Sequence, residues 1–404
     1  MKEFFTFEDF DLENKTVALR VDLNLPYSPK TDELSETPRL YKHLETIRIL
    51  MEKGAKTVLL AHQGRKGDED FISLEKHAKL LEKHLGSKVK FLPFGENFEV
   101  IKELEKGELL VLDNTRFYDD EKFDKCMEEH AESELPKKLA PYIDYFVLDG
   151  FSVSHRGHAS VVGFANLKPC IAGPVFENEI KNLEGFFEKI KNSKSCFILG
   201  GAKPKEPLKL MEHWIEKDVS ILTTGIISLL FLIAKGYDLG YTKKFLEEKG
   251  YLKYMDIIES LFENFSAKIK IPVDLAIEEN GNRKEISVED LPTEKQIFDI
   301  GEKTIAEYEK IISDSEIVCM KGTSGMYENK NFEFGTKKLF ELLENNKNTL
   351  LGGGNTTDAL EKFKIPFDKF GYVSLGGGAF AEFLTGKKFP GIESLELSFM
   401  KFKK

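Results

Sequence analysis

Short apolar runs rich in branched residues alternate with longer amphipathic, charged stretches along almost all of this 404-residue chain. The alternation is typical of βαβ units, in which parallel strands form a sheet that helices cover. The predicted strands are Thr16–Leu19, Thr57–Ala61, Leu109–Leu112, Tyr145–Leu148, Ser195–Leu199, Val219–Leu222, Ile317–Met320, Thr349–Leu351 and Tyr372–Ser374. Between the first two, Leu40–Lys53 repeats apolar residues at helical spacing, and Gly54 ends that helix. We therefore expect an α/β fold with parallel sheets.

The length of the chain and one long helical segment predict its division into domains. A single core stops growing well below 404 residues, so two domains of roughly 200 residues are expected. Pro174–Lys191 predicts one continuous helix between them rather than a loose linker. We predict two Rossmann-like lobes with a cleft between them, divided into 1–172 for the first lobe, 173–191 for a hinge helix and 192–389 for the second lobe. Ligands of open parallel sheets bind beyond the carboxyl ends of the strands.

Composition excludes several classes of function. The net charge of −11 argues against a general nucleic-acid binder. No apolar run approaches the ~18 residues that span a bilayer, and the first ten residues carry acids where a signal peptide needs bases. The cysteines are far apart, form no CxxC pair and are expected to be reduced and mostly in the core: Cys126, Cys170, Cys196 and Cys319. We expect a cytoplasmic protein with no membrane partner.

Arginine is rare and unevenly placed. The chain has seven arginines against 51 lysines, so lysine serves for solubility. Five of the seven lie in or beside predicted strand ends and loops of the first 156 residues, and they are Arg20, Arg39, Arg65, Arg116 and Arg156. A planar guanidinium with five donors is preferred over an ammonium where a carboxylate or phosphate is held by two hydrogen bonds. The first lobe is therefore expected to bind a small, highly anionic molecule.

Three glycine clusters follow predicted strands of the second lobe. They are Gly200-Gly201, Gly352-Gly353-Gly354 and Gly376-Gly377-Gly378. Glycines let backbone N–H groups face a ligand, and the helix N-terminus that follows favours negative charge. None fits the GxxxxGK[ST] loop or the GxGxxG fingerprint. A phosphate-rich ligand is expected here, and Lys203, directly after the first cluster, is placed to meet a migrating phosphoryl group.

These features meet in one family resemblance. The chain resembles phosphoglycerate kinases, archaeal ones especially, nearly from end to end. In the first lobe the matching segments are RVDLNLP from Arg20, HQGR from His62, NTRFY from Asn114 and HRGHAS from His155. In the second lobe they are GGAK from Gly200, PVD from Pro272, DIG from Asp299, GGGNT from Gly352 and SLGGGA from Ser374.

The resemblance implies reversible phosphoryl transfer between 1,3-bisphosphoglycerate with ADP and 3-phosphoglycerate with ATP, in glycolysis and gluconeogenesis, with Mg²⁺. It implies hinge bending and a C-terminal tail, 390–404, that packs on the first lobe. The implied 3-phosphoglycerate-binding residues are Asp22, Asn24, Arg39, His62, Gln63, Gly64, Arg65, Arg116 and Arg156. The implied nucleotide-binding residues are Gly201, Lys203, Glu328, Gly353, Gly354, Asn355 and Thr356. Arg39 and Lys203 would be catalytic and flank the transferring group, and we expect a monomer or homodimer.

Departures from the family pattern concentrate in the second lobe. Where the family usually has an aspartate that helps to hold the metal, this chain has Asn355. The asparagine keeps an oxygen ligand but lacks the negative charge. Lys321 and Thr323 replace an asparagine and a proline, and Leu375 replaces a hydroxyl residue. Pro207 stands where many members carry a second lysine.

Three interpretations of these departures stay open. The first is an ordinary kinase with compensation, for instance by Lys321. The second is a kinase with a changed phosphoryl donor or metal, and the third is a non-catalytic binder of phosphorylated acids. A dinucleotide-dependent oxidoreductase would need the glycine fingerprint followed by a ribose-binding acid, which the sequence lacks. Metal-dependent hydrolysis has little support, because no Cys or His completes a ligand set with His155 and His158.

Overall fold

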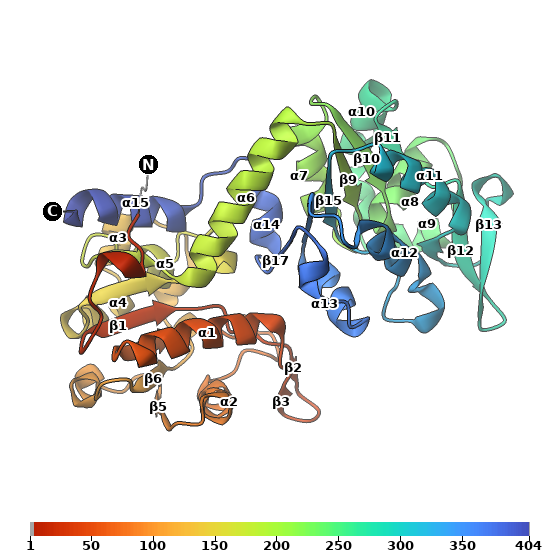
Figure 1. The fold of residues 1–404 in the computed structure, drawn as a ribbon. Coiled ribbons are helices and arrows are strands. Elements are labelled where there is room, and N and C mark those ends of the chain that lie inside the picture. The colour runs from red at the N-terminus through yellow and green to blue at the C-terminus, as the bar shows by residue number, and fades with distance from the viewer. Residues whose placement is uncertain (1–3, 404) are drawn as a thin grey trace. The chain divides into compact units, whose positions relative to one another are not determined.

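The structure is a computed structural model that describes residues 4–403. The chain divides into two compact units, Met1–Lys181 with Lys388–Lys404 and Asn182–Lys387 (Figure 1). Within the described range, no helix is long and apolar enough to cross a membrane.

A six-stranded parallel sheet in the order β5-β6-β4-β1-β7-β8 forms the centre of the first unit. Its strands are β1 Thr16–Arg20, β4 Lys56–Leu60, β5 Val89–Leu92, β6 Leu109–Leu112, β7 Tyr145–Leu148 and β8 Cys170–Ala172. A small hairpin, β2 Tyr27–Ser28 and β3 Glu33–Leu34, lies outside the sheet. Because β4 pairs with one side of β1 and β7 with the other, the strand order reverses at β1. Ligand crevices of open sheets lie at such a reversal.

Helices cover this sheet through apolar faces. In α1, Leu40, Leu44 and Ile47 are buried at helical spacing, and Pro38 stands in the first turn, where its missing N–H costs nothing. The helices of the unit are α1 Pro38–Glu52, α2 Glu75–Leu85, α3 Met127–Ala131, α4 Glu134–Leu139, α5 Ala159–Val162 and α15 Pro390–Phe402. The C-terminal α15 packs on β8, where the Cys170 N–H donates to Ser398 Oγ at 2.7 Å (Figure 1).

The second unit has its own parallel sheet in the order β11-β10-β9-β15-β16-β17. Its strands are β9 Ser195–Leu199, β10 Val219–Thr223, β11 Ile269–Lys270, β15 Ile317–Lys321, β16 Thr349–Gly352 and β17 Tyr372–Ser374. The strand order reverses between β9 and β15. A separate antiparallel sheet contains β12 Asp274–Glu279, β13 Asn282–Ser287 and β14 Ile297–Ile300.

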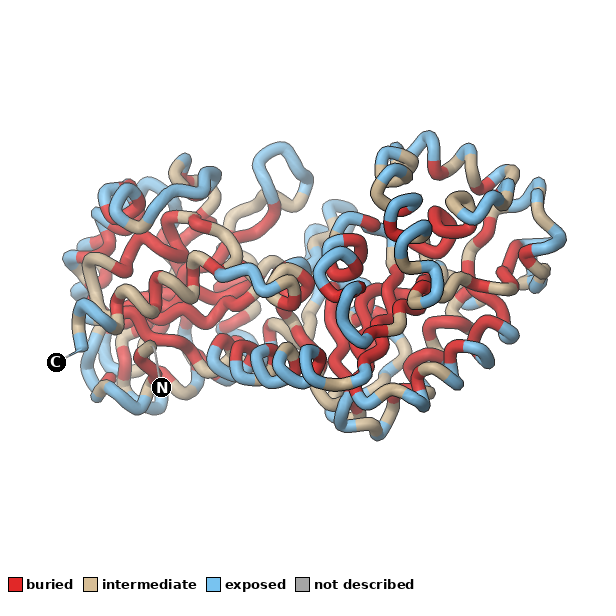
Figure 2. The backbone as a smooth tube through the Cα atoms, turned by 90° about the horizontal axis from the view of Figure 1, so that it is seen from above, coloured by how far each residue is buried: buried red, intermediate tan, exposed pale blue. Residues whose placement is uncertain are grey.

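The helices of the second unit flank its parallel sheet, whose strands are almost wholly buried (Figure 2). They are α7 Lys205–Trp214, α8 Gly225–Ala234, α9 Tyr241–Glu248, α10 Met255–Phe265, α11 Glu302–Ser313, α12 Phe334–Leu343, α13 Gly354–Lys362 and α14 Gly378–Phe383. The helix α6, Pro174–Asn192, contributes residues to both units.

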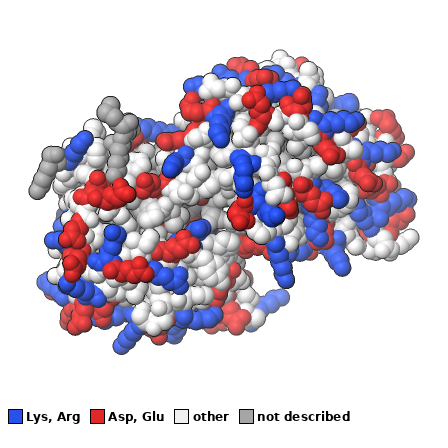
Figure 3. Space-filling view, in the orientation of Figure 1, with Lys and Arg blue, Asp and Glu red and all other residues white. Residues whose placement is uncertain are grey.

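The expected α/β class with two parallel sheets is confirmed, and each predicted strand is present with ends within one residue. The antiparallel sheet was not predicted. Its strand β13 is mostly polar and has no buried residue, so it has no apolar run to signal it. The cysteines are free as expected, and Cys126 is the exposed one. On the face drawn in Figure 3 lysines and acids are interspersed, as surface ion pairs such as Lys338 with Glu341 illustrate.

Candidate functional site

Four strand ends of the first unit bring charged side chains to one edge of its sheet. Asp22 follows β1, His62 and Arg65 follow β4, Arg116 follows β6, and Arg156 follows β7. The strands are parallel, so their carboxyl ends lie at the same edge, next to the reversal at β1. Residues up to 134 positions apart therefore meet in one place, as the arginine distribution predicts.

Electrostatics show how close the guanidinium groups are. Burial, and then the like charges of Arg156, Arg20 and Arg65, lower the pKa of Arg116 to about 10. Arg116 still carries its full charge at neutral pH. Repulsion among these groups is unfavourable, and a bound phosphate or carboxylate would relieve it, because each of its oxygens can accept hydrogen bonds from more than one guanidinium group. The arrangement is that of an anion site.

Arg20 differs from the other arginines of the cluster. It is 2% exposed, and its Nε donates to Ser160 Oγ at 2.8 Å. Its Nη2 lies 3.1 Å from His62 Nδ1 and 3.9 Å from Glu121 Oε1. Arg20 is the one of the five N-terminal strand-end arginines that the resemblance does not imply for substrate binding, and the protein itself engages its side chain. Its partners come from distant segments, so the sequence carried no signal for them.

Arg20 and burial also set the state of His62. Burial, and then the charge of Arg20, lower the pKa of His62 well below its usual value, so the ring is neutral at physiological pH. A neutral imidazole beside Arg20 can direct one ring nitrogen to a ligand while the other faces the guanidinium. His62 is thus placed as an uncharged hydrogen-bonding group within a cationic site.

Asp22 is the carboxylate of this edge. Its Oδ2 lies 3.0 Å from Nη1 of Arg39 in the first turn of α1, and Ser152 donates a short hydrogen bond to the same oxygen. Burial would raise the pKa of Asp22, but Arg39 and the hydrogen bonds from Ser152 and from the Asn24 N–H lower it overall. Asp22 is therefore ionised and orients Arg39. Ser152 was not predicted, since a lone serine on a loop has no distinguishing pattern.

The loop after β4 is fixed by backbone contacts. The Gly64 N–H donates to Asn24 Oδ1 at 2.9 Å, and the Arg116 guanidinium donates to the Gly64 carbonyl. Gln63 was predicted to bind substrate, but its side chain is fully buried, with its amide bonded to both backbone groups of Leu25 at 2.9 and 3.0 Å. This geometry gives Gln63 a structural role.

The second unit contains a largely apolar cavity of about 250 Å³ at the strand reversal between β9 and β15. Ile226, Leu229 and Phe245 supply part of its apolar wall. Of the predicted nucleotide-binding residues, three line it, namely Gly201, Glu328 and Asn355. A largely apolar cavity that also has exposed polar side chains in its lining, such as Glu328 and Asn355, suits a heterocyclic base attached to a polar sugar phosphate.

Close backbone approach explains why glycines border this cavity. Gly225, which begins α8, has φ +53°, and a Cβ there would lie 2.7 Å from the Gly201 nitrogen. Any side chain would therefore push the loop after β9 away from α8. The loop after β9 therefore stays in contact with the start of α8, and both segments line the cavity.

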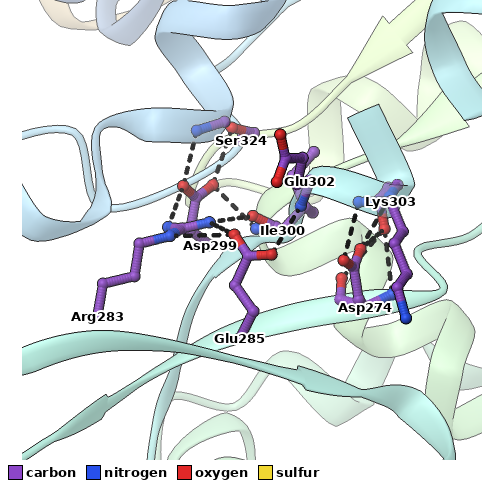
Figure 4. Close-up of polar contacts among 10 residues, drawn as sticks. Asp274, Arg283, Glu285, Asp299, Ile300, Glu302, Lys303 and Ser324 are labelled. Atoms are coloured by element: carbon purple, nitrogen blue, oxygen red, sulfur yellow. Dashed lines mark hydrogen bonds and ion pairs between the residues drawn. The ribbon is translucent and has the colours of Figure 1, made fainter. Parts of the chain in front are cut away.

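Asp299, a buried carboxylate, fixes another segment that lines the cavity. Asp299 Oδ1 accepts from Ser324 Oγ at 3.0 Å, and its Oδ2 accepts from the Gly335 N–H at 2.8 Å and pairs with Arg283 Nη1 at 2.9 Å (Figure 4). Burial raises the pKa of Asp299 to about 6 in spite of these partners. Asp299 thereby positions Thr323–Gly325, which lines the cavity.

The remaining predicted residues lie outside the cavity lining. Lys203 is exposed after β9, and Gly353 caps α13 with φ 99°. Thr356 was predicted at the nucleotide phosphates, but it is fully buried and its Oγ1 accepts from the Gly322 N–H at 2.9 Å. That hydrogen bond ties the loop after β15 to α13. Gly354 is exposed at the start of α13.

An anion site of clustered guanidinium groups in one α/β unit and a glycine-bordered cavity in the other define the chain as a phosphotransferase. Its sequence matches the profile of the family described as phosphoglycerate kinase over residues 7–387. The chain belongs to the phosphoglycerate kinase family.

Named relatives and solved structures agree with this assignment. The chain is 38% identical to a phosphoglycerate kinase of Methanococcus maripaludis, covering 99% of this chain and 100% of that one. It is 36% identical to phosphoglycerate kinase 1 of Methanosarcina acetivorans, covering 98% and 96%. A crystal structure of phosphoglycerate kinase from Pyrococcus horikoshii matches with a TM-score of 0.92 at 36% identity, covering 98% of this chain and 100% of that one. The resemblance deduced from the motifs is confirmed.

Proposed function

We propose that the chain transfers a phosphoryl group reversibly between 1,3-bisphosphoglycerate with ADP and 3-phosphoglycerate with ATP, as a glycolytic and gluconeogenic kinase. The single observation that supports this most is the ionised Asp22–Arg39 pair beside a crowded cluster of like-charged guanidinium groups. The mutual repulsion in a cluster of that kind is unfavourable unless a ligand with several negative charges binds there. 3-Phosphoglycerate carries a phosphate and a carboxylate, which matches that need.

The first unit is proposed to hold the acid substrate. Arg65, Arg116 and Arg156 would grip its phosphate, and Arg39 its carboxylate. Asp22, Asn24 and neutral His62 would accept from or donate to the hydroxyl and carboxylate groups, while Gly64 sets the loop. Arg20 would not contact the substrate, and its contact with His62 would fix the orientation of that ring.

The second unit is proposed to hold the nucleotide. The base would enter the apolar cavity at the β9–β15 reversal, and Glu328 at the rim would accept from the ribose hydroxyls. Backbone N–H groups at Gly353 and Gly354 at the start of α13 would then face the phosphates, with Lys203 near the terminal one. The chemistry of the cavity supports a purine nucleotide, whose base is flat and largely apolar on both faces.

The transfer itself needs positioning and charge neutralisation more than covalent participation by the protein. An oxygen of the 3-phosphoglycerate carboxylate attacks the terminal phosphorus of ATP, and the bond from that phosphorus to the bridging oxygen breaks, which releases ADP. Arg39 and Lys203 would neutralise charge on the oxygens of the group in transit. The reverse reaction uses the same contacts.

Magnesium is best treated as part of the nucleotide substrate. Residues 4–403 contain no group of three or more His, Cys, Asp or Glu side chains that could hold a metal ion. Asn355 offers one neutral amide oxygen, and Mg²⁺ binds phosphates and carboxylates more strongly than amides. These residues do not fit a metal centre built by the protein, so we derive no step from one.

Transfer also requires the two bound substrates to meet. We propose that the two units move about α6, whose residues belong to both of them, during turnover. This movement would exclude water from the reacting groups. The free cysteines fit a reducing compartment, and we propose a cytoplasmic enzyme. A monomer or homodimer remains our expectation.

A coupled assay of 3-phosphoglycerate phosphorylation, with a panel of nucleoside triphosphates and divalent cations, tests the proposal. Turnover with ATP and Mg²⁺ is the expected result. Turnover that requires another donor or metal would support the altered kinase instead. Saturable binding of 3-phosphoglycerate with no turnover under any condition would contradict the proposal and support a non-catalytic binder.

A further inference from the structure

A buried lysine in the second unit has no role in the site as described so far. Lys321 is the last residue of β15, and it is 6% exposed. Its Nζ lies 2.6 Å from Oε2 of Glu206, in the first turn of α7. Burial lowers the pKa of Lys321, Glu206 opposes that effect, and Lys203 is near enough to reinforce it. The two lysines therefore share one region.

The surroundings of the pair are the glycine loops. A Cβ placed on Gly353 would lie 3.6 Å from Cγ and 3.7 Å from Cε of Lys321, so the side chain runs alongside the loop that begins α13. A Cβ on Gly378 would lie 3.4 Å from Glu206 Oε1. The pair thus stands where the loops after β15, β16 and β17 and the first turn of α7 converge, the region that the proposed function assigns to the nucleotide phosphates.

Stability alone gives little reason for an ammonium there. Burying a charged ammonium carries a large desolvation cost, and an apolar side chain of similar volume is commonly at least as stable. A buried lysine that pairs with a partly buried glutamate, beside the loop proposed to bind phosphates, therefore calls for another explanation.

Two departures from the family pattern meet at this pair. The resemblance drawn from the motifs implies a second lysine at the position of Pro207 and an asparagine at the position of Lys321. These positions are 114 residues apart, yet Lys321 reaches Glu206, the immediate neighbour of Pro207. Lys321 on β15 therefore supplies a positive charge to the turn of α7 that has Pro207 in place of a lysine.

We propose that Lys321 binds the phosphate chain of the nucleotide and that Glu206 positions its ammonium for this contact. The inference rests on the proposed function, since it assigns a phosphate ligand to that site. An ammonium has three N–H donors, so one can stay on Glu206 while the others reach phosphate oxygens. Glu206 holds the ammonium in place in the absence of ligand, and Lys203 and Lys321 together supply the cationic partners of the phosphates.

Calorimetric titration of AMP, ADP and ATP into the parent protein and Lys321→Met tests the inference. We expect AMP affinity to change less than twofold, ATP affinity to fall at least tenfold, and ADP to lie between, because only the outer phosphates reach Lys321. Lys321→Arg should recover most of the ATP affinity. Lys338→Met, which removes an exposed lysine of an ion pair on α12, is the matched control and should bind all three like the parent.

The competing explanation is a purely structural link between β15 and α7, and it predicts other results. An equal loss of affinity for AMP, ADP and ATP in Lys321→Met would overturn the inference. If that variant does not fold, Glu206→Gln decides. Glutamine keeps a side-chain oxygen that accepts from the Lys321 ammonium, so ATP affinity should fall no more than about threefold, whereas a tenfold loss for all three nucleotides would indicate the structural link.

The outcome is separable from that of the proposed function. A parent protein that shows the graded dependence on Lys321 but does not phosphorylate 3-phosphoglycerate would uphold the inference and contradict the proposed reaction. A parent that turns over normally, with ATP affinity unchanged in Lys321→Met, would contradict the inference alone. A parent that binds none of the three nucleotides would overturn both.

Discussion

Arg283 Nη1 lies 2.9 Å from Asp299 Oδ2, and this contact joins the antiparallel strand β13 to the wall of the cavity in the second unit. Arg283 also donates to the Ile300 carbonyl at 2.7 Å and to Glu285 Oε1 at 2.9 Å (Figure 4). An arginine outside the main cluster thus serves as counter-ion to a buried carboxylate. That carboxylate in turn holds Ser324 and the loop that borders the cavity.

The raised pKa of Asp299 predicts how stability depends on pH. Between its ordinary value of 3.8 and about 6, the folded protein retains a proton that the unfolded chain has released. Stability contributed by this group is therefore complete at low pH and is lost as the pH rises through that window, by about 3 kcal/mol for a shift of this size. Denaturant titrations of Asp299→Asn should lack this loss, while Glu285→Gln should retain it. The same pH dependence in Asp299→Asn and the parent would contradict the prediction.

Arg39 offers a test of transition-state charge stabilisation. We expect Arg39→Ala to lower turnover by on the order of 100-fold or more, because the guanidinium held by Asp22 is lost from the transferring group. Arg48→Ala is the control on the same helix, since Arg48 is exposed and donates to the His84 carbonyl at 3.0 Å. Steady-state kinetics in both directions provide the measurement. A variant within a few-fold of the parent would show that Arg39 has no such role.

Gly64 is expected to tolerate no side chain. Its φ is +64°, and a Cβ would lie 2.4 Å from the carbonyl of Asp70. Gly64→Ala should therefore destabilise the first unit by about 3 kcal/mol or more and weaken 3-phosphoglycerate binding, since Asn24 and Arg116 both bond to this residue.

Gly67→Ala in the same loop is the control for that change. Gly67 has φ +99° but open space around its Cβ position, so only backbone strain of about 1 kcal/mol is expected. Thermal unfolding and calorimetry of both variants provide the comparison. Equal effects of the two substitutions would mean that the contact with Asp70 does not matter.

Asn355 predicts an effect of restoring a carboxylate. Asn355→Asp should tighten binding of the magnesium–nucleotide complex about tenfold, because Mg²⁺ prefers a charged oxygen ligand, while metal-free nucleotide should bind more weakly by repulsion. Asn348→Asp adds the same charge on an exposed loop of the same unit and should change neither affinity. Calorimetry with and without Mg²⁺ separates the two effects. Unchanged or weaker binding of the magnesium complex would argue against a metal ligand at this position.

The sequence determined the α/β alternation, the positions of nine of the parallel strands and the family. Strands such as Tyr145–Leu148 are buried on both faces, so they appear as continuous apolar runs whose ends are marked by the first polar or glycine residue. The glycine clusters and arginines also lie at those ends, so their gathering follows from parallel strands alone. The local sequence pattern was therefore sufficient to predict which residues gather at the ends of the parallel strands.

Tertiary structure decided which side chains of those motifs are engaged by other parts of the protein. Arg20 and Gln63 lie in matching motifs, yet buried partners 38 to 140 residues away engage them. The Lys321–Glu206 pair likewise joins positions that look like unrelated departures in the sequence. A side chain's direction depends on which distant groups complete its hydrogen bonds, and a linear pattern carries no information on that choice.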